Sequence, residues 1–110
     1  MAHADRELRA AQNQMLFRSR NEQMIELGEA VGGAPPELDF VCECADEGCM
    51  DRIRLSALQF LAVESDKNQF IVVRGHEMPE VEDVIAEREN FLIVSARGAG
   101  AEFVKNQSSH

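Results

Sequence analysis

The pattern of apolar and polar positions predicts one long helix followed by several short strands. Residues 5–30 contain no Pro and no Gly before Gly28, so they are expected to be helical, with Asp5 as the N-cap. The Gly- and Pro-rich run 31–36 ends this helix. Residues 38–42, 52–55 and 69–73 then have the short apolar or alternating patterns that are typical of strands.

A second, shorter helix is expected between two of these strands. Ser56 followed by Gln59 is a capping-box pattern, which predicts a helix from there to about Glu64. The apolar residues expected to form its buried side are Leu58, Leu61 and Ala62.

The segment 79–89 fits two structures. Val81, Val84 and Ile85 are compatible with a helix that has Pro79 in its first turn. They are equally compatible with a strand that forms a hairpin with residues 91–95. The hairpin is favoured, because Glu89-Asn90 suits the turn.

These elements predict a single α+β domain over residues 1–110. It has a long N-terminal helix at about 5–30 and a small, mostly antiparallel sheet with one short helix at about 38–96. The region 97–101 is rich in Gly and Ala, and residues 105–110 are expected to be a loose tail.

The long helix has two apolar faces. The face predicted to pack in the core consists of apolar residues at helical spacing, namely Leu16, Phe17, Met24, Leu27 and Val31. A second stripe, formed by Leu8, Ala11 and Met15, points elsewhere. We expect this stripe, flanked by Arg9 and Arg18, to contact a protein partner or a second copy in a homodimer. The alternative is that the first turns simply expose a few apolar side chains.

Charge excludes several classes of partner. The chain has 20 acidic and 11 basic residues and a net charge of −9, which repels nucleic acid and anionic lipid. No apolar run approaches the length of a membrane helix, and Met1–Arg9 lacks the apolar region of a signal peptide. We therefore expect a cytoplasmic protein that binds neither membranes nor nucleic acid.

The cysteines are the clearest chemical signal. All three, Cys42, Cys44 and Cys49, lie in one short stretch, and His76 follows the strand 69–73. Three thiolates and one imidazole are a complete tetrahedral set for zinc, and clustered cysteines in a reducing compartment indicate metal more often than disulfides. Gly48 is expected to permit the tight backbone that brings Cys49 to the metal.

Other interpretations of this cluster stay open. Glu43, Asp46, His3 and His110 are alternative fourth ligands to His76. The cysteines could also be small buried hydrophobic residues, although their acidic neighbours argue against a dry site. A nucleophilic pair of Cys49 and His76 would leave the other two cysteines without a role.

A family resemblance rests on the same residues. The pattern Phe40-Val41-Cys42-Glu43-Cys44, with Cys49 and Gly75-His76, resembles that of a group of small uncharacterised bacterial proteins, mainly from actinomycete-type genomes. Phe17-Arg18, Asn21-Glu22, Ile53, Leu55 and Phe70 also fit, so that the resemblance extends from about Ala11 to Val94. Phe60 and Arg74 depart from it, since the group typically has Tyr and often Pro there. The resemblance implies that the four ligands act together and that the later part forms two strands; it implies no activity.

The sequence thus predicts a zinc-binding interaction or regulatory module without catalysis of its own. A thiol-based redox sensor, in which oxidation expels zinc, is the alternative from another class. A zinc-dependent enzyme is more distant, because four protein ligands leave no coordination position for water or substrate.

Overall fold

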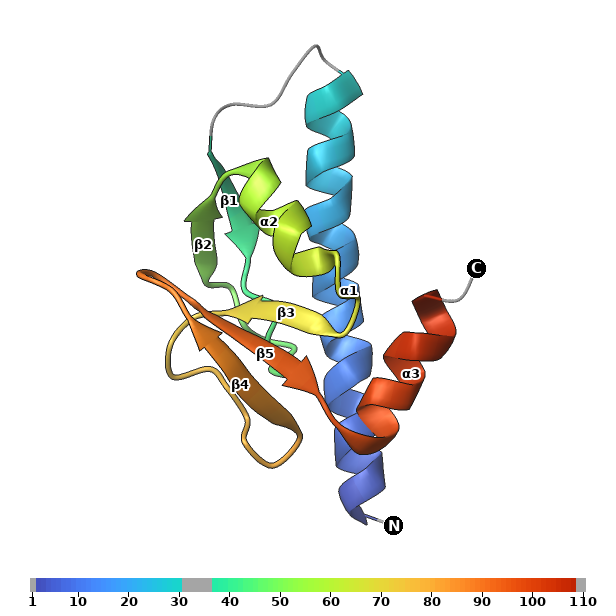
Figure 1. Ribbon diagram of the computed structural model, residues 1–110. Helices are drawn as coiled ribbons and strands as arrows, with labels where there is room; N and C mark the ends of the chain where they lie inside the picture. Colours follow the sequence, from blue (N-terminus) through green and yellow to red (C-terminus); the bar gives the residue numbers. More distant parts are fainter. Residues whose placement is uncertain (1, 31–36, 109–110) are drawn as a thin grey trace.

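The computed structural model describes residues 2–30 and 37–108, and describes the backbone alone at residues 2, 3, 29, 30 and 108. Its helices and strands follow the predicted order, with one further helix after the last strand, and make an α+β fold (Figure 1). In chain order they are α1 (Ala2–Ala30), β1 (Leu38–Val41), β2 (Arg52–Leu55), α2 (Ala57–Glu64), β3 (Gln69–Val72), β4 (Glu82–Glu87), β5 (Leu92–Ala96) and α3 (Gly98–Ser108). No helix in the described part of the chain combines the length and apolar content that spanning a bilayer requires.

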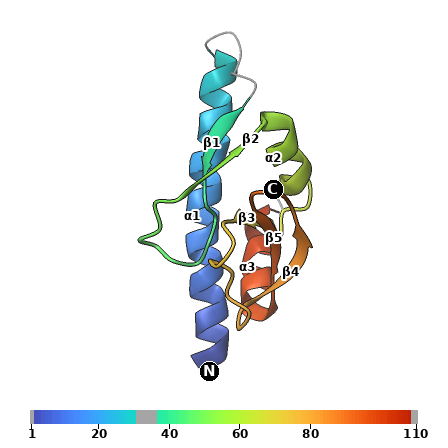
Figure 2. The same ribbon diagram turned by 90° about the vertical axis from the view of Figure 1, so that its left-hand side faces the viewer.

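The strands form two small antiparallel sheets. One pairs β1 with β2, with Leu38 opposite Leu55, and the other has the order β3-β5-β4. The pairing of β4 with β5 confirms the predicted hairpin, and a register shift between Val84 and Ala86 interrupts it. Both sheets and α2 lie along α1, which runs the length of the molecule, and α3 lies beside its N-terminal half (Figures 1 and 2).

Aromatic stacking determines which face of α2 is buried. Phe60 is fully buried and stacks on Phe40 of β1, with ring centroids 4.7 Å apart. The capping box at Ser56 is confirmed, but the predicted buried side is wrong: Leu58 is 80% exposed and Leu61 is 41% exposed, and Ala62 is exposed as well. This short helix has apolar residues of its own on several sides, so the spacing of its apolar residues could not identify the side that meets Phe40.

The two faces predicted for α1 are only partly correct. Phe17 is buried and Met24 packs against the core, but Leu16 is 64% exposed and Leu27 is 68% exposed. Val31 lies outside the described residues. In the second stripe, Ala11 is fully buried, and the half-buried Met15 packs against the hydrophobic core.

The buried part of this stripe is explained by α3, which replaces most of the predicted loose tail. The helix continues through Lys105 to Ser108, and its Val104 is buried. At Gly100, an added Cβ would lie 2.7 Å from the backbone oxygen of Glu7 and 3.2 Å from the Cβ of Ala11. The Gly/Ala-rich segment therefore permits close helix packing, because side chains larger than hydrogen do not fit at this contact.

Candidate metal centre

Three separate segments bring the predicted ligands together. Cys42 and Cys44 follow β1, Cys49 precedes β2, and His76 follows β3. One ligand atom from each of these four residues lies within 4.8 Å of the other three, and all three cysteines are free thiols. The predicted set is therefore confirmed as an arrangement that can hold a metal ion.

Extended backbone explains why two cysteines converge while the residue between them does not. Side chains alternate sides in an extended segment, so Cys42 and Cys44 face the cluster and Glu43 faces the interior. Glu43 is fully buried, and its carboxylate accepts hydrogen bonds from Arg18 at 2.9 and 3.0 Å and from the backbone N–H of Ile71 at 3.1 Å. Because of these hydrogen bonds, the Glu43 carboxylate, an alternative fourth ligand in the sequence analysis, is engaged inside the protein.

Arg18 belongs to this buried network. Its side chain is 2% exposed, and its guanidinium lies 4.5 Å from the centroid of Phe70 and 5.5 Å from that of Phe60. It also donates a hydrogen bond to the carbonyl oxygen of Gln69. The prediction that Arg18 flanks a partner surface is therefore corrected: α1 uses this charge to fix Glu43 inside the molecule.

Two asparagines of α1 hold the backbone around the cysteines. Asn21 donates to the carbonyl oxygen of Val41 at 3.0 Å and accepts the N–H of Val41 at 2.8 Å, as a neighbouring strand would. Asn13 donates to the carbonyl oxygen of Cys44 at 3.1 Å. The ligand segment is thus attached to α1 at both ends.

A tight turn brings Cys49 round to the cluster. The Asp46 carboxylate accepts the N–H of Gly48 at 2.9 Å, and the Asp46 carbonyl accepts the N–H of Cys49 at 3.0 Å. Asp46, another alternative ligand, thereby shapes the loop. Gly48 lies in this turn, as expected, and a second glycine near the ligands, Gly75, has a left-handed backbone with φ +94°. Gly75 aims the following residue, His76, at the thiols.

His76 faces the sulfurs with one ring nitrogen and a carboxylate with the other. Its Nδ1 lies 3.6 Å from the Sγ of Cys42 and 3.5 Å from that of Cys49. Its Nε2 lies 3.1 Å from an Oδ2 of Asp51. Sequence reasoning missed Asp51, whose only signal was an acidic residue close after Cys49. The side chain of His3 and all of His110 lie outside the described part of the chain.

A second buried carboxylate fixes the loop after His76. Glu82 is 1% exposed, and it accepts hydrogen bonds from Gln14 at 2.6 Å and from the backbone N–H of Met78 at 2.8 Å. Burial raises the pKa of Glu82. The contact joins this loop to α1, so the same helix supports the loops on both sides of the cluster.

The thiols need a cation if they are all to ionise. A hydrogen bond from Cys42 lowers the pKa of Cys44 to about 5, and the same hydrogen bond, together with burial, raises the pKa of Cys42. Burial also raises the pKa of Cys49. Without a metal ion, the cluster therefore favours ionisation of one thiol and disfavours ionisation of the other two. A bound metal ion would stabilise all three thiolates. The N–H of Val73, 3.3 Å from the Sγ of Cys42, is already placed to stabilise a thiolate.

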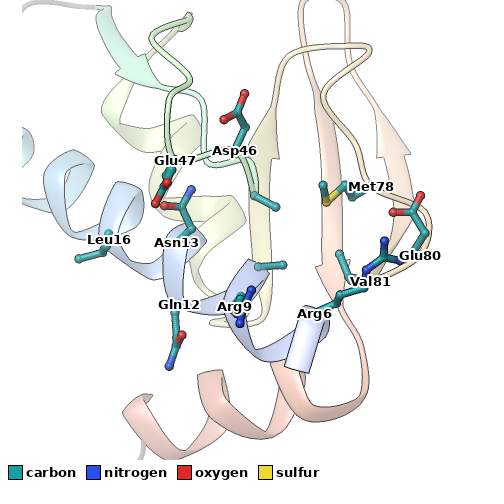
Figure 3. Close-up of a pocket in the computed structure, with 12 residues that line it drawn as sticks. Arg6, Arg9, Gln12, Asn13, Leu16, Asp46, Glu47, Met78, Glu80 and Val81 are labelled. Carbon is teal, nitrogen blue, oxygen red and sulfur yellow. The ribbon is translucent and has the colours of Figure 1, made fainter. Parts of the chain in front are cut away.

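Two hollows lie near the cluster, and the smaller one is lined by two of the proposed ligands. A cavity of about 240 Å³ is lined by Cys44, Ala45, Asp46, Gly75, His76, Glu77 and Met78. A larger groove of about 770 Å³ lies between α1, the cysteine loop and the loop after His76, and Figure 3 shows its labelled side chains. Arg6, Arg9 and Leu16 line its helix side, opposite Glu47 and Glu80.

Comparison with known proteins gives no relative from which a function could be transferred. No protein-family model, curated protein or solved structure matches this chain. The resemblance to small actinomycete-type proteins therefore stays a prediction, and the function is inferred from the cluster itself.

Proposed function

We propose that this chain is a small zinc-binding protein whose Cys42, Cys44, Cys49 and His76 hold one structural zinc ion. The observation that carries the proposal is the convergence of four soft donors within 4.8 Å of one another. Thiolates and imidazoles in this number are the ligands that zinc takes in closed, four-coordinate structural sites. The three thiolates must stay reduced, which favours the cytoplasm as the compartment.

The proposed role of the metal is structural and not catalytic. A catalytic zinc keeps one position for water, whereas these four residues would complete the shell. The Asp51 carboxylate, which could otherwise act as a general base, is engaged with His76. The distances also do not favour Cys49 and His76 as a nucleophilic pair, because the sulfur of Cys42 lies almost as close to the imidazole as that of Cys49.

Removing one ligand tests this role. We expect Cys44→Ser to lose bound zinc and cooperative unfolding together, because zinc binding of about 10–16 kcal/mol in such sites is coupled to folding. Glu47→Gln is the matched control in the same loop, since Glu47 is exposed. Circular dichroism during urea unfolding, with zinc assayed on the same samples, gives the readout. A zinc-free Cys44→Ser protein that unfolds like the control would contradict a structural role.

We further propose that the module acts by binding a protein partner or a second copy through α1. The groove beside the metal centre supports this, because Arg6 and Arg9 have no ion-pair partner among the described residues and Leu16 is exposed. This surface takes the place of the partner-binding stripe predicted from the sequence, in which Ala11 is fully buried and Leu8 and Met15 are half-buried. Sedimentation of wild type and Leu16→Glu, with capture of partners from the native host, tests it. A monomer whose captured proteins are the same for both variants would contradict the interaction role.

A redox sensor is the second candidate, favoured by access to the sulfurs. Cys49 is partly exposed, and Cys44 lines the 240 Å³ cavity. Peroxide could oxidise two thiolates to a disulfide, with two protons taken up, two water molecules formed and zinc released. A structural site predicts slow zinc loss in mild peroxide. Rapid loss that is reversed by thiol, followed with a zinc-sensitive dye, would favour the sensor.

A further inference from the structure

We propose that Asp51 is a positioning residue of the metal centre: its carboxylate holds the Nε2–H of His76 so that Nδ1 is the atom presented to zinc. This inference rests on the proposed zinc site and adds to it a residue that does not bind the metal. The ring nitrogens of histidine are not equivalent, and the group bound to one determines which proton the other carries.

The imidazole bridges two different environments. Its Nδ1 lies 3.5–3.6 Å from the sulfurs of Cys49 and Cys42, while its Nε2 lies 3.1 Å from the Asp51 carboxylate. Nε2 is therefore the donor in the neutral ring, and the lone pair on Nδ1 is directed at the cluster. Metal-bound histidines in proteins commonly have such a carboxylate on the second nitrogen.

The backbone of Asp51 places its carboxylate. Its carbonyl oxygen accepts the N–H of Cys42 at 3.0 Å, so its backbone is fixed beside one of the proposed ligands. Arg52, the next residue, begins β2 and pairs with Val41 of β1. Asp51 therefore contacts Cys42 through its backbone and His76 through its side chain, and the β1–β2 hairpin that carries all three cysteines also sets the position of the carboxylate.

The other acidic residue next to His76 is already engaged. Glu77 accepts the N–H of Gly75 at 2.7 Å and so stabilises the left-handed turn before the histidine. Among the described residues, Asp51 is the carboxylate that contacts His76 Nε2. Its side chain is 59% exposed, against 30% for His76, so that water can replace part of its effect.

Two measurements on the zinc-loaded protein test this role. Loss of such a carboxylate typically weakens metal binding about 10–100-fold, and the exposure of Asp51 places the expected loss for Asp51→Ala near tenfold. Asp51→Asn keeps an oxygen that can accept the hydrogen bond and should recover part of the affinity. Asp39→Ala is the control, because Asp39 is an exposed aspartate of β1 that contacts Arg54. Competition with a zinc chelator gives the affinities.

The second measurement identifies the coordinating atom. Nitrogen-15 NMR of the imidazole should show zinc on Nδ1 and a proton on Nε2 in wild type, with faster exchange of that proton in Asp51→Ala. A merely structural role for Asp51 would not change this exchange. Zinc on Nε2, or equal zinc affinity of Asp51→Ala and Asp39→Ala, would overturn the inference and leave the zinc site standing. Wild type that binds no zinc would overturn both.

Discussion

At the scale of single residues, the most consequential feature is the charge buried beside the metal centre. Arg18 and Glu43 are both almost completely inaccessible, and the network around them fixes the segment between Cys42 and Cys44 to α1. A buried ion pair is costly to break, because one charge then stays in the interior without its partner. The helix and the ligand segment should therefore depend on each other for stability.

This dependence predicts a large difference between two arginines of α1. Arg18→Met should lower the free energy of unfolding of the zinc-loaded protein by about 3–5 kcal/mol, because Glu43 loses its cation. Arg9→Met, at an exposed position, should change it by about 0.5 kcal/mol or less. Urea unfolding at saturating zinc gives both values. Equal effects of the two substitutions would contradict the proposed dependence.

A second prediction concerns pH. The pKa of Glu22 is raised from 4.5 to about 7, first by burial and then by the neighbouring Glu64, against the opposing charges of Arg18 and Lys67. Between these values the folded state keeps a proton that the unfolded state has lost, so this group makes stability fall as pH rises. Glu22→Gln should be more stable than wild type at pH 7.5, with a difference that shrinks toward pH 5. A difference that does not vary with pH in zinc-loaded urea unfolding would contradict this assignment.

At the scale of elements, α1 combines a buried face with an exposed one in adjacent residues. Met15 is half-buried against the core, whereas Leu16 is 64% exposed. Met15→Ala should therefore lower the free energy of unfolding by about 1–2 kcal/mol, less than for a fully buried methionine. Leu16→Ala should change it by about 0.5 kcal/mol or less. Thermal unfolding compares them, and a larger loss for Leu16 would reverse the assigned faces.

The contact between α1 and α3 gives a test with a matched glycine. Gly100→Ala places a Cβ 2.7 Å from the Glu7 backbone oxygen and should cost about 1–3 kcal/mol, because two helix backbones must separate. Gly48→Ala is the control, since its added Cβ meets only the Asp46 side chain at 3.5 Å. Urea unfolding should give a lower free energy of unfolding for Gly100→Ala than for Gly48→Ala. A tolerated Gly100→Ala would mean that the helices do not pack this closely.

Local signals in the sequence were sufficient for every described element except α3. The helix and strand patterns, the Ser56 capping box and the β4–β5 hairpin were all predicted, because each depends on residues near one another in the chain. The buried faces were not, because they depend on distant partners such as Phe40 for α2 and Gly100 for α1. The loose tail expected at 105–110 is instead helical to Ser108, and the Gly/Ala-rich segment 97–101 before it permits close helix packing.

The same distinction applies to the metal centre. The four ligands could be predicted because cysteine and histidine are scarce in this chain and have a specific chemistry. Asp51, Arg18 and Glu43 could not, since acidic and basic residues are common here and their partners are fixed only by the fold. Alternation in extended backbone could have placed Glu43 opposite the two cysteines, but not identified Arg18 as its partner.

At the scale of the whole molecule, the cluster joins the two sheets, which share one hydrophobic core but are not paired strand to strand. The two sheets are separate, and the backbone hydrogen bond from Glu43 to Ile71, 2.7 Å long, links the ligand segment to β3. A metal ion held by Cys42, Cys44 and Cys49 on one side and His76 on the other would fix the two sheets together. This is the contribution expected of zinc in a small domain with few aromatic residues.

The metal content of the purified protein tests this account most directly. Wild type prepared without chelators should contain one zinc ion per chain by elemental analysis, and His76→Ala and Cys44→Ser should each contain much less. Asp39→Ala, which changes an exposed residue on β1, should retain the wild-type amount. Folded, cooperatively unfolding wild type with no bound metal would contradict the account.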